Sequence, residues 1–290
     1  MKDLNLTTPV HFQWNLPKFT PETILVSQGS CFSERITDEL FAAGFKGSAN
    51  PNGILYNPFS IYESIRRIVS MESYAEDEFF QFNGKWHSWA HHGSFSDPDR
   101  SELCRKCNES MEIFRKNAEQ ADLFLVTLSS AVVYERKETK QITANCHKVP
   151  NHQFNCRLLS LPETLDAVNG IAQQACLLSP RATILFTLSP VRHYPGDLLL
   201  NARSKAMLLT ALHECCDQQE RVCYFPAYEI IMDELRDYRF YKEDMLHPSP
   251  LATEIVVSRF MEQCFDNDSH VLLRESRKRL KAAGHIAKGG

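Results

Sequence analysis

Two adjacent side chains near the start of the chain, Ser30 and Cys31, could act as nucleophiles. Residues 23–27 are mostly apolar and β-branched, which predicts a buried strand, and from Phe32 the apolar residues recur at helical spacing. Ser30 and Cys31 therefore lie in a sharp turn between strand and helix, as in a nucleophile elbow. The N–H groups and partial positive charge of a helix N-terminus favour a thiolate and a developing oxyanion. An ordinary turn in which a small residue caps the helix fits the same pattern.

A second motif, Asp244-Met245-Leu246-His247, stands near the C-terminus, just before a helical pattern. An Asp three residues before a His, ahead of the last helix, is how SGNH (GDSL-type) hydrolases supply their acid and base. The chain resembles the GSCFA family, a bacterial branch of that superfamily, over about residues 20–266. The blocks that carry the resemblance are GSCF (29–32), NPNGILYNP (50–58), NCHKVP (145–150), TLSPVRH (187–193), SKA (204–206) and YFPAYEIIMDELRDYRFYKEDMLHPS (224–249).

The resemblance implies a role for each member of a catalytic triad. Aligning Gly29-Ser30-Cys31-Phe32 with the Gly-Asp-Ser-Leu block makes Cys31 the nucleophile, and Ser30 is the alternative if the turn is shifted by one residue. A small buried thiol without a catalytic role is the third interpretation. His247 would be the general base and Asp244 would fix its tautomer, unless His247 only caps the last helix. A thiol near a helix N-terminus and an imidazole ionises easily, so we expect Cys31 to be the most reactive of the ten thiols.

The oxyanion hole is where the sequence departs from the superfamily pattern. Gly53 can stand for the glycine of the second block, but Ser129-Ser130-Ala131 occupies the position where the third block usually has an Asn. Asn52, Asn145 or the backbone N–H of Cys31 could supply the missing donor. One lost donor costs about 3 kcal/mol of transition-state stabilisation.

Several basic side chains are further candidates for contacts with a substrate. Arg192 and His193 follow a predicted central strand, and His147 lies in the block that contains Asn145. An Arg at such a position can bind a carboxylate or a phosphate through two parallel hydrogen bonds. The alternative for Arg192 is an ion pair within the chain, with Glu229, Asp233 or Asp237.

The elements that must position these residues form an alternating pattern. Predicted strands at 23–27, 122–128, 183–188 and 222–225 are separated by helices, which predicts an α/β fold, a three-layer α/β/α sandwich with a central parallel sheet of the SGNH/flavodoxin-like type. Active sites of such sheets lie beyond the carboxyl ends of the strands. Four segments follow those ends and should converge on one crevice: 30–31, 129–130, 189–193 and 226–229.

One segment interrupts the pattern. Asn83-Gly84 stands between two aromatic runs and predicts a small β-hairpin within an insertion at about residues 76–100. The hairpin either packs over the sheet as a ribbon or forms a wall of the substrate cleft. We expect a single domain over residues 1–270, followed by a polar tail at 271–290.

Composition excludes several classes of partner. The chain has 290 residues, of which 43% are hydrophobic and 23% charged, an ordinary globular composition. A net charge of −4 argues against nucleic acid, and the absence of a signal-peptide pattern and of a long apolar run argues against secretion and a membrane span. Ten cysteines without such a signal predict reduced thiols in a cytoplasmic protein. We expect no cofactor and no metal, because His91-His92 and Cys104-x-x-Cys107 lack further ligands at metal-binding spacing.

These observations predict an enzyme that hydrolyses an acyl ester of a small molecule or a glycan. An acyltransferase would use the same site with a hydroxyl group in place of water. A non-catalytic, glycan-binding module of the same fold is the alternative that the missing third-block Asn favours. The sequence indicates neither the acyl group nor the oligomeric state.

Overall fold

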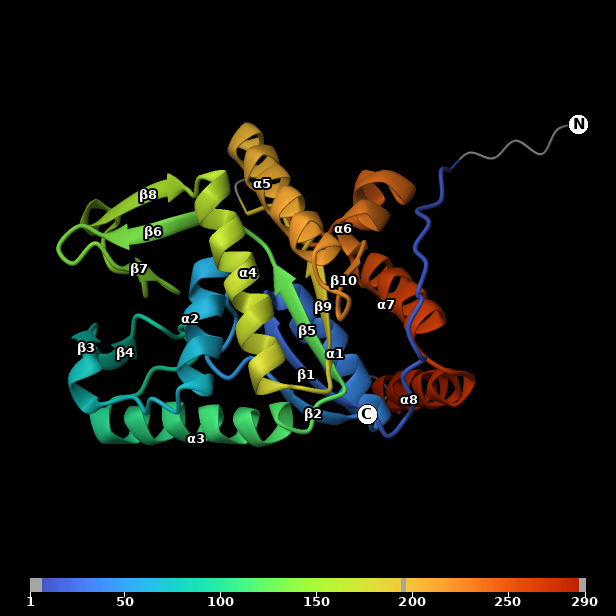
Figure 1. Ribbon diagram of the computed structural model, residues 1–290, viewed down its shortest axis with the longest axis horizontal. Coiled ribbons are helices and arrows are strands. Elements are labelled where there is room, and N and C mark those ends of the chain that lie inside the picture. Colours follow the sequence, from blue (N-terminus) through green and yellow to red (C-terminus); the bar gives the residue numbers. More distant parts are fainter. Residues whose placement is uncertain (1–6, 194–196, 287–290) are drawn as a thin grey trace, which may run out of the picture.

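A five-stranded parallel sheet lies at the centre of the molecule (Figure 1), in a computed structural model that describes residues 7–193 and 197–286. The strand order is β10-β9-β5-β1-β2. The strands are β1 (Ile24–Gly29), β2 (Lys46–Ala49), β5 (Leu123–Leu128), β9 (Thr183–Leu188) and β10 (Val222–Phe225). Because all neighbours are parallel, the carboxyl ends of the strands share one edge of the sheet.

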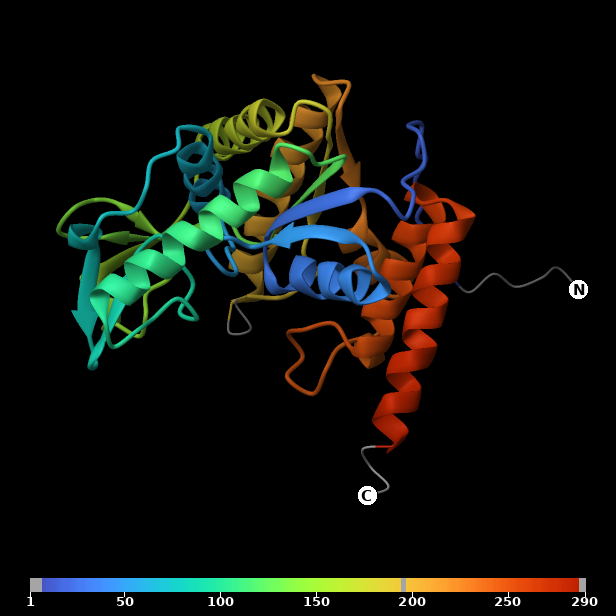
Figure 2. The same ribbon diagram turned by 90° about the horizontal axis from the view of Figure 1, so that it is seen from below.

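Helices cover both faces of this sheet, so the predicted three-layer fold is confirmed (Figure 2). One face carries α2 (Pro58–Val69), α3 (Arg100–Ala118), α4 (Leu161–Leu178) and α5 (Leu198–Asp217). The other face carries α1 (Cys31–Ala43), α7 (Pro250–Cys264) and α8 (Asn267–Ile286). A short helical segment, α6 (Ala227–Glu229), continues into a π-helical turn, Ile230–Glu234.

Strand β5 explains why the central strands are apolar throughout. Phe124 and Val126 pack into the core under α2–α5, whereas Leu123 and Leu125 pack into the core under α1 and α7. Successive side chains of a strand point to opposite faces, and both faces are buried here. The apolar run therefore fixes the strand in the middle of the sheet.

A second, antiparallel region lies beside α2, on the left in Figure 1. The predicted hairpin is present as β3 (Phe79–Phe82) and β4 (Lys85–Ser88), and both turn residues have positive φ angles, 49° at Asn83 and 75° at Gly84. A three-stranded sheet has the order β7 (Ile142–Thr143), β6 (Val132–Arg136), β8 (Phe154–Leu158). The two parts touch, because the Ala144 N–H donates to the Trp89 carbonyl at 2.8 Å.

The C-terminal segment differs from the predicted polar tail, because residues 267–286 form the helix α8. Leu273 is buried in the core beside α1, and Arg277 binds Glu39 of α1 and the Ser258 hydroxyl. This segment therefore packs against the helices α1 and α7. No helix within residues 7–193 and 197–286 combines the length and the apolar character needed to cross a lipid bilayer.

Candidate active site

The turn after β1 gives Ser30 and Cys31 different environments. Ser30 is the N-cap of α1: it is fully buried, and its Oγ accepts a hydrogen bond of 3.3 Å from the Phe32 N–H. Cys31 is the first residue of the helix and stays partly exposed. A side chain at Gly29 would meet the Thr127 carbonyl oxygen at 2.3 Å, so only glycine allows β1 and β5 to approach this closely before the turn. Of the two candidate nucleophiles, Cys31 is the more accessible.

The electrostatics around Cys31 differ from the expectation of an easily ionised thiol. Burial raises the pKa of the Cys31 thiol, and the nearby carboxylate of Glu34 raises it further. Arg35, the Cys31 backbone N–H and Lys242 act in the opposite direction but more weakly. We therefore infer that the resting thiol keeps its proton at neutral pH and depends on a base to lose it.

His247 and Asp244 form the pair that the sequence predicts. The His247 Nδ1–H donates to Asp244 Oδ2 at 2.8 Å, and the His247 and Leu246 N–H groups donate to Oδ1 at 3.0 and 2.8 Å. These bonds hold the pKa of Asp244 well below its usual range, the two backbone N–H groups contributing most. The carboxylate is therefore ionised at neutral pH, and it leaves Nε2 of His247 free for proton transfer.

The segment that carries this pair, residues 241–249, is fixed to the same end of the sheet as Cys31. The Lys242 N–H donates to the His247 carbonyl at 2.8 Å, and the Arg192 N–H, after β9, donates to the Leu246 carbonyl at 3.1 Å. The positive charge of Lys242 acts to lower the pKa of the Cys31 thiol, although the larger effect of burial keeps that pKa raised. Among the described residues no hydrogen bond joins Cys31 to His247; such catalytic contacts often form only when a substrate is bound.

His193 lies after β9, at the strand ends, as a neutral side chain. Its Nε2 is hydrogen-bonded to Ser129 Oγ, and its ring meets the Tyr56 ring edge-on at 5.0 Å. Burial, aided by Lys205 and then His247, lowers the pKa of His193 to about 3. The ring is thus uncharged at neutral pH and held in one orientation, which suits a wall of the site.

The backbone amides at the end of β5 are already occupied. The N–H groups of Ser129 and Ser130 both donate to the Tyr56 carbonyl, at 3.0 and 2.9 Å. These bonds hold the loop 50–57 on the sheet, so the two N–H groups are not free to bind a substrate oxygen. The Cys31 N–H lies at the first position of α1, where N–H groups have no acceptor within the helix, and it is the remaining candidate oxyanion donor.

The structure does not bring the two predicted Asn donors to Cys31. Asn52 is buried; its Nδ2 donates to Tyr74 OH at 2.8 Å and to the Ala90 carbonyl at 3.0 Å. Asn145 Oδ1 accepts from the His147 N–H at 2.8 Å, in a loop whose His147 Nε2 lies 2.7 Å from the Ser88 carbonyl. Both therefore serve the contact between the loops and the hairpin.

Gly53 and Arg192 also make other contacts than those expected. The Gly53 N–H donates to the Asn50 carbonyl at 2.8 Å and so closes a turn. The Arg192 guanidinium lies over the Tyr241 ring at 4.3 Å and the Tyr238 ring at 5.3 Å, which is a cation–π contact and not the ion pair considered above. Arg192 therefore braces the 241–249 segment from the end of β9.

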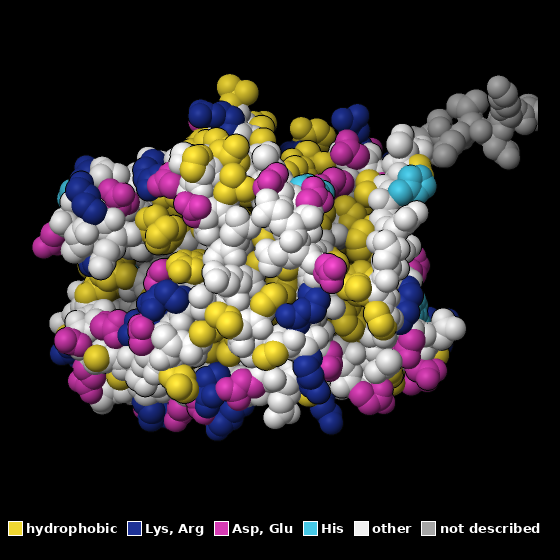
Figure 3. All heavy atoms as spheres, in the orientation of Figure 1, with side chains coloured by type: hydrophobic (Ala, Val, Ile, Leu, Met, Phe, Trp, Pro, Cys, Tyr) yellow, Lys and Arg dark blue, Asp and Glu magenta, His cyan; other side chains and the backbone are white. Residues whose placement is uncertain are grey.

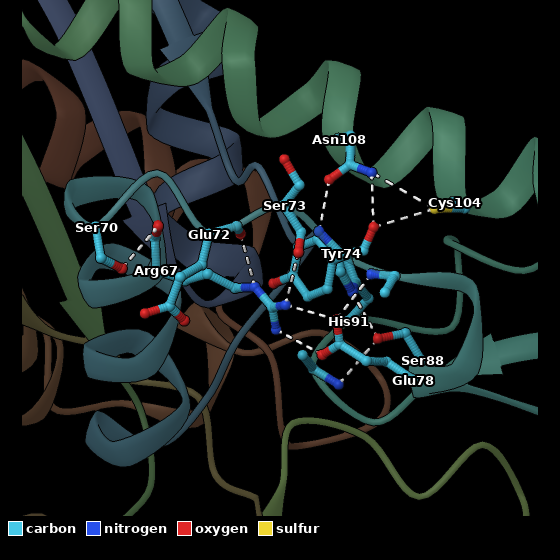
Figure 4. A network of polar contacts seen from close by, with 12 residues as sticks. Arg67, Ser70, Glu72, Ser73, Tyr74, Glu78, Ser88, His91, Cys104 and Asn108 are labelled. Atoms are coloured by element: carbon cyan, nitrogen blue, oxygen red, sulfur yellow. Dashed lines mark hydrogen bonds and ion pairs between the residues drawn. The ribbon is translucent and has the colours of Figure 1, made fainter.

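The hairpin belongs to a polar network away from Cys31 (Figure 4). His91 is buried, its Nδ1 lies 2.8 Å from Ser88 Oγ, and burial lowers its pKa to about 3. Cys104 donates to the Tyr74 carbonyl at 3.2 Å, which ties α3 to the same network. These contacts give His91 and Cys104 packing roles.

A cavity of about 830 Å³ lies between α2, the hairpin and the β6–β8 sheet, and Figure 3 shows the surface hollowed there. Phe80, Trp89 and Arg136 line it, whereas Cys31 and His247 do not. The hairpin thus borders a cavity that Cys31 and His247 do not line.

Lys205 is a residue at the strand ends that sequence reasoning missed. It lies on α5, is only 2% exposed, and donates from Nζ to the Ser129 and Ser189 carbonyl oxygens, both at 2.6 Å. The SKA block contains it, and a Lys on the inner face of a helical pattern was the signal that could have identified it.

Comparisons with known proteins give one family match and several solved structures of low sequence identity. A family model described as the GSCFA family matches residues 24–260. Three solved structures resemble the chain at low identity. A Streptococcus pneumonia protein provisionally named a platelet activating factor is 12% identical, with a TM-score of 0.43 and 83% of each chain covered. The acetyl xylan esterase Est2A from the rumen bacterium Butyrivibrio proteoclasticus is 10% identical, with a TM-score of 0.39, covering 86% of this chain and 64% of that one.

The third is a Clostridium thermocellum family 3 carbohydrate esterase, 11% identical, with a TM-score of 0.36, covering 89% of this chain and 98% of that one. A search of curated proteins found no match. The family match spans both the turn at Cys31 and the segment with Asp244 and His247, and the chain belongs to the GSCFA family.

Proposed function

We propose that this protein hydrolyses an acyl ester of a small molecule or a glycan, with Cys31 as nucleophile, His247 as general base and Asp244 as the group that orients His247. The observation that carries the proposal is the 2.8 Å hydrogen bond between His247 Nδ1 and Asp244 Oδ2. It lies on a segment fixed to the same strand ends as Cys31, and it leaves the other imidazole nitrogen free.

In the first half-reaction the Cys31 sulfur bonds to the acyl carbon while His247 Nε2 takes the thiol proton. The ester C–O bond then breaks, and the alcohol leaves with that proton, which gives a thioester. In the second half-reaction water attacks the thioester, with His247 accepting a water proton. The S–C bond breaks, the carboxylic acid leaves, and the proton returns to the thiolate.

The raised pKa of the Cys31 thiol fits this sequence of steps. A thiol that keeps its proton in the resting protein needs His247 at the moment of attack, as a serine would. The Cys31 N–H at the start of α1 would then stabilise the oxyanion, supported by the partial positive charge of the helix end.

A non-catalytic glycan-binding module is the second candidate. The observation that favours it is the loss of two possible amide donors, because the Ser129 and Ser130 N–H groups are used by the Tyr56 carbonyl. Binding of an acylated glycan without turnover of any ester would support this candidate.

The test is hydrolysis of short-chain p-nitrophenyl esters, together with intact mass spectrometry of the protein after rapid quenching. We expect an acyl adduct on Cys31 and no turnover in Cys31→Ala. Ser30→Ala should keep part of the activity but lose about 1 kcal/mol of stability, because the α1 cap is removed. Cys156→Ala, at an exposed thiol, is the matched control and should behave like wild type. Full turnover in Cys31→Ala would refute the assignment.

A further inference from the structure

Lys205 carries an amino group that is buried against the carboxyl ends of two central strands. Its Nζ donates to the Ser129 carbonyl after β5 and to the Ser189 carbonyl after β9, each at 2.6 Å. The Tyr228 ring, after β10, lies 5.9 Å away. The side chain therefore joins the ends of the neighbouring strands β5 and β9. Two of the three N–H groups of the ammonium are used in this way, and the third can donate to another acceptor.

This lysine has no acidic partner in the part of the chain that the structure describes: its two hydrogen bonds go to neutral carbonyl groups. Burying an ammonium group without a counter-charge is costly, and lysines are seldom fully buried unless they are paired. An apolar side chain would avoid that cost but would leave the two strand-end carbonyls without this donor. The ammonium group therefore holds the strand ends together, and its charge is left without a counter-charge in the described structure.

Cys31 is the group on which such a charge would act. Strand β1 pairs with β5, Gly29 opposite Thr127, and the Ser30 N–H donates to the Thr127 carbonyl at 3.2 Å. Cys31 and Ser129 each lie two residues beyond that pair, at adjacent strand ends. Consistent with this placement, a Cys31 thiolate would raise the pKa of Lys205.

We propose that Lys205 is a positioning residue whose ammonium group, held by two strand-end carbonyls, stabilises the negative charge that develops at Cys31. The inference rests on the proposed function in taking Cys31 as the nucleophile. The charge would compensate for the amide donor that the third block lacks.

The effect should depend on pH, because burial lowers the pKa of Lys205 to about 7. Below that pH the group is charged and favours a Cys31 thiolate, and above it the support is lost. The other titratable groups that act on Cys31, Lys205 or their immediate neighbours are Glu34, Arg35, Tyr56, His193, Tyr228, Lys242 and His247. None of the acids among them approaches Lys205 closely enough to pair with it in the described structure.

The test is the rate of Cys31 alkylation by iodoacetamide against pH, followed by peptide mass spectrometry, which needs no substrate. In Lys205→Met we expect alkylation near pH 6.5 to be about tenfold slower, as for the loss of a nearby unit charge. Ser204→Ala is the control: it is the buried neighbour on α5, and its Oγ accepts the Ala131 N–H at 2.7 Å, but it carries no charge. Its profile should match wild type. Thermal melts show that each variant is folded.

An unchanged alkylation profile in a folded Lys205→Met variant would overturn the proposal, as would an equal slowing in Ser204→Ala. If Lys205→Met does not fold, the wild-type alkylation rate against pH decides the question. The increase of that rate with pH should become less steep above about pH 7, where Lys205 loses its charge. A single-proton titration curve would contradict the coupling. Coupled titration without any ester turnover would instead refute the proposed function and leave the role of Lys205 intact.

Discussion

Neighbouring residues can have opposite roles because backbone position decides which side chain is free. Ser30 and Cys31 are both small and carry a potential nucleophile, but the N-cap position commits the Ser30 hydroxyl to α1. The first helical position leaves the Cys31 sulfur partly exposed, next to its own N–H group, which has no acceptor within α1. The argument for Cys31 therefore rests on helix geometry and not on intrinsic acidity, which burial opposes.

Thiol reactivity should depend on the type of reagent. Cys156 is exposed, whereas Cys31 is partly buried with a raised pKa. We predict that iodoacetamide at neutral pH labels Cys156 faster than Cys31, contrary to the expectation from sequence that Cys31 is the most reactive thiol. An activated ester should instead acylate Cys31 first, because His247 assists that attack. Peptide mapping after brief exposure to each reagent measures both rates; the same labelling order with both reagents would contradict the prediction.

Single residues were predictable from sequence where local pattern decides their position. The turn at Cys31 and the Asp244–His247 pair are local: each follows from a few neighbouring residues. Asn52 was not, because its partner Tyr74 lies 22 residues away and nothing nearby indicates that contact. Lys205 was missed for the same reason, because its acceptors are strand-end carbonyls that only the assembled sheet brings together.

At the scale of elements, the 241–249 segment is a preformed support for the imidazole. Backbone bonds from Lys242 and Arg192 hold it, and Arg192 also stacks on Tyr241. Asp244 binds two backbone N–H groups as well as the ring, so it orders the segment and His247 together.

This arrangement predicts unequal costs for the two substitutions in the pair. His247→Ala should reduce kcat by about 10²–10⁴-fold, because proton transfer needs the imidazole itself. Asp244→Ala should cost less, since the ring stays in place but is less well oriented. Asp244→Asn is the matched variant: it keeps an oxygen acceptor for the backbone N–H groups but removes the charge. Rates against pH with thermal melts test this; full activity in folded His247→Ala would refute the triad.

The strands that sequence predicted well are the buried ones. Strand β9 occupies the expected residues 183–188, because burial on both faces requires a continuous apolar run. Strand β2, with the sequence KGSA, was not among the predicted strands, because it carries no β-branched residue. Its position follows from pairing with β1 at the sheet edge, and strand β8 likewise depends on its pairing with β6. Such pairing information is not local.

At the scale of the whole molecule, two polar regions can be distinguished. Cys31, His247 and Lys205 gather at the strand ends, whereas the hairpin and the β6–β8 sheet enclose the cavity beside α2. His91 and His147 are buried and His193 is partly buried, and desolvation lowers their pKa values, to about 3 for His91 and His193 and about 4 for His147. All three are neutral in the folded protein at neutral pH.

Buried neutral histidines make folding sensitive to mild acid. An unfolded histidine titrates near pH 6.5, so between about pH 6.5 and 3 the unfolded chain binds more protons than the folded one. Stability is therefore retained above that window and is lost as the pH falls through it. We predict that urea midpoints decrease from pH 7 to pH 5, and that His91→Gln, which cannot take up a proton, shows a smaller decrease. His152→Gln, at an exposed site, is the control and should keep the wild-type pH dependence. If His91→Gln folds and loses as much stability as wild type over this range, the burial of a neutral His91 is not what makes the protein acid-sensitive.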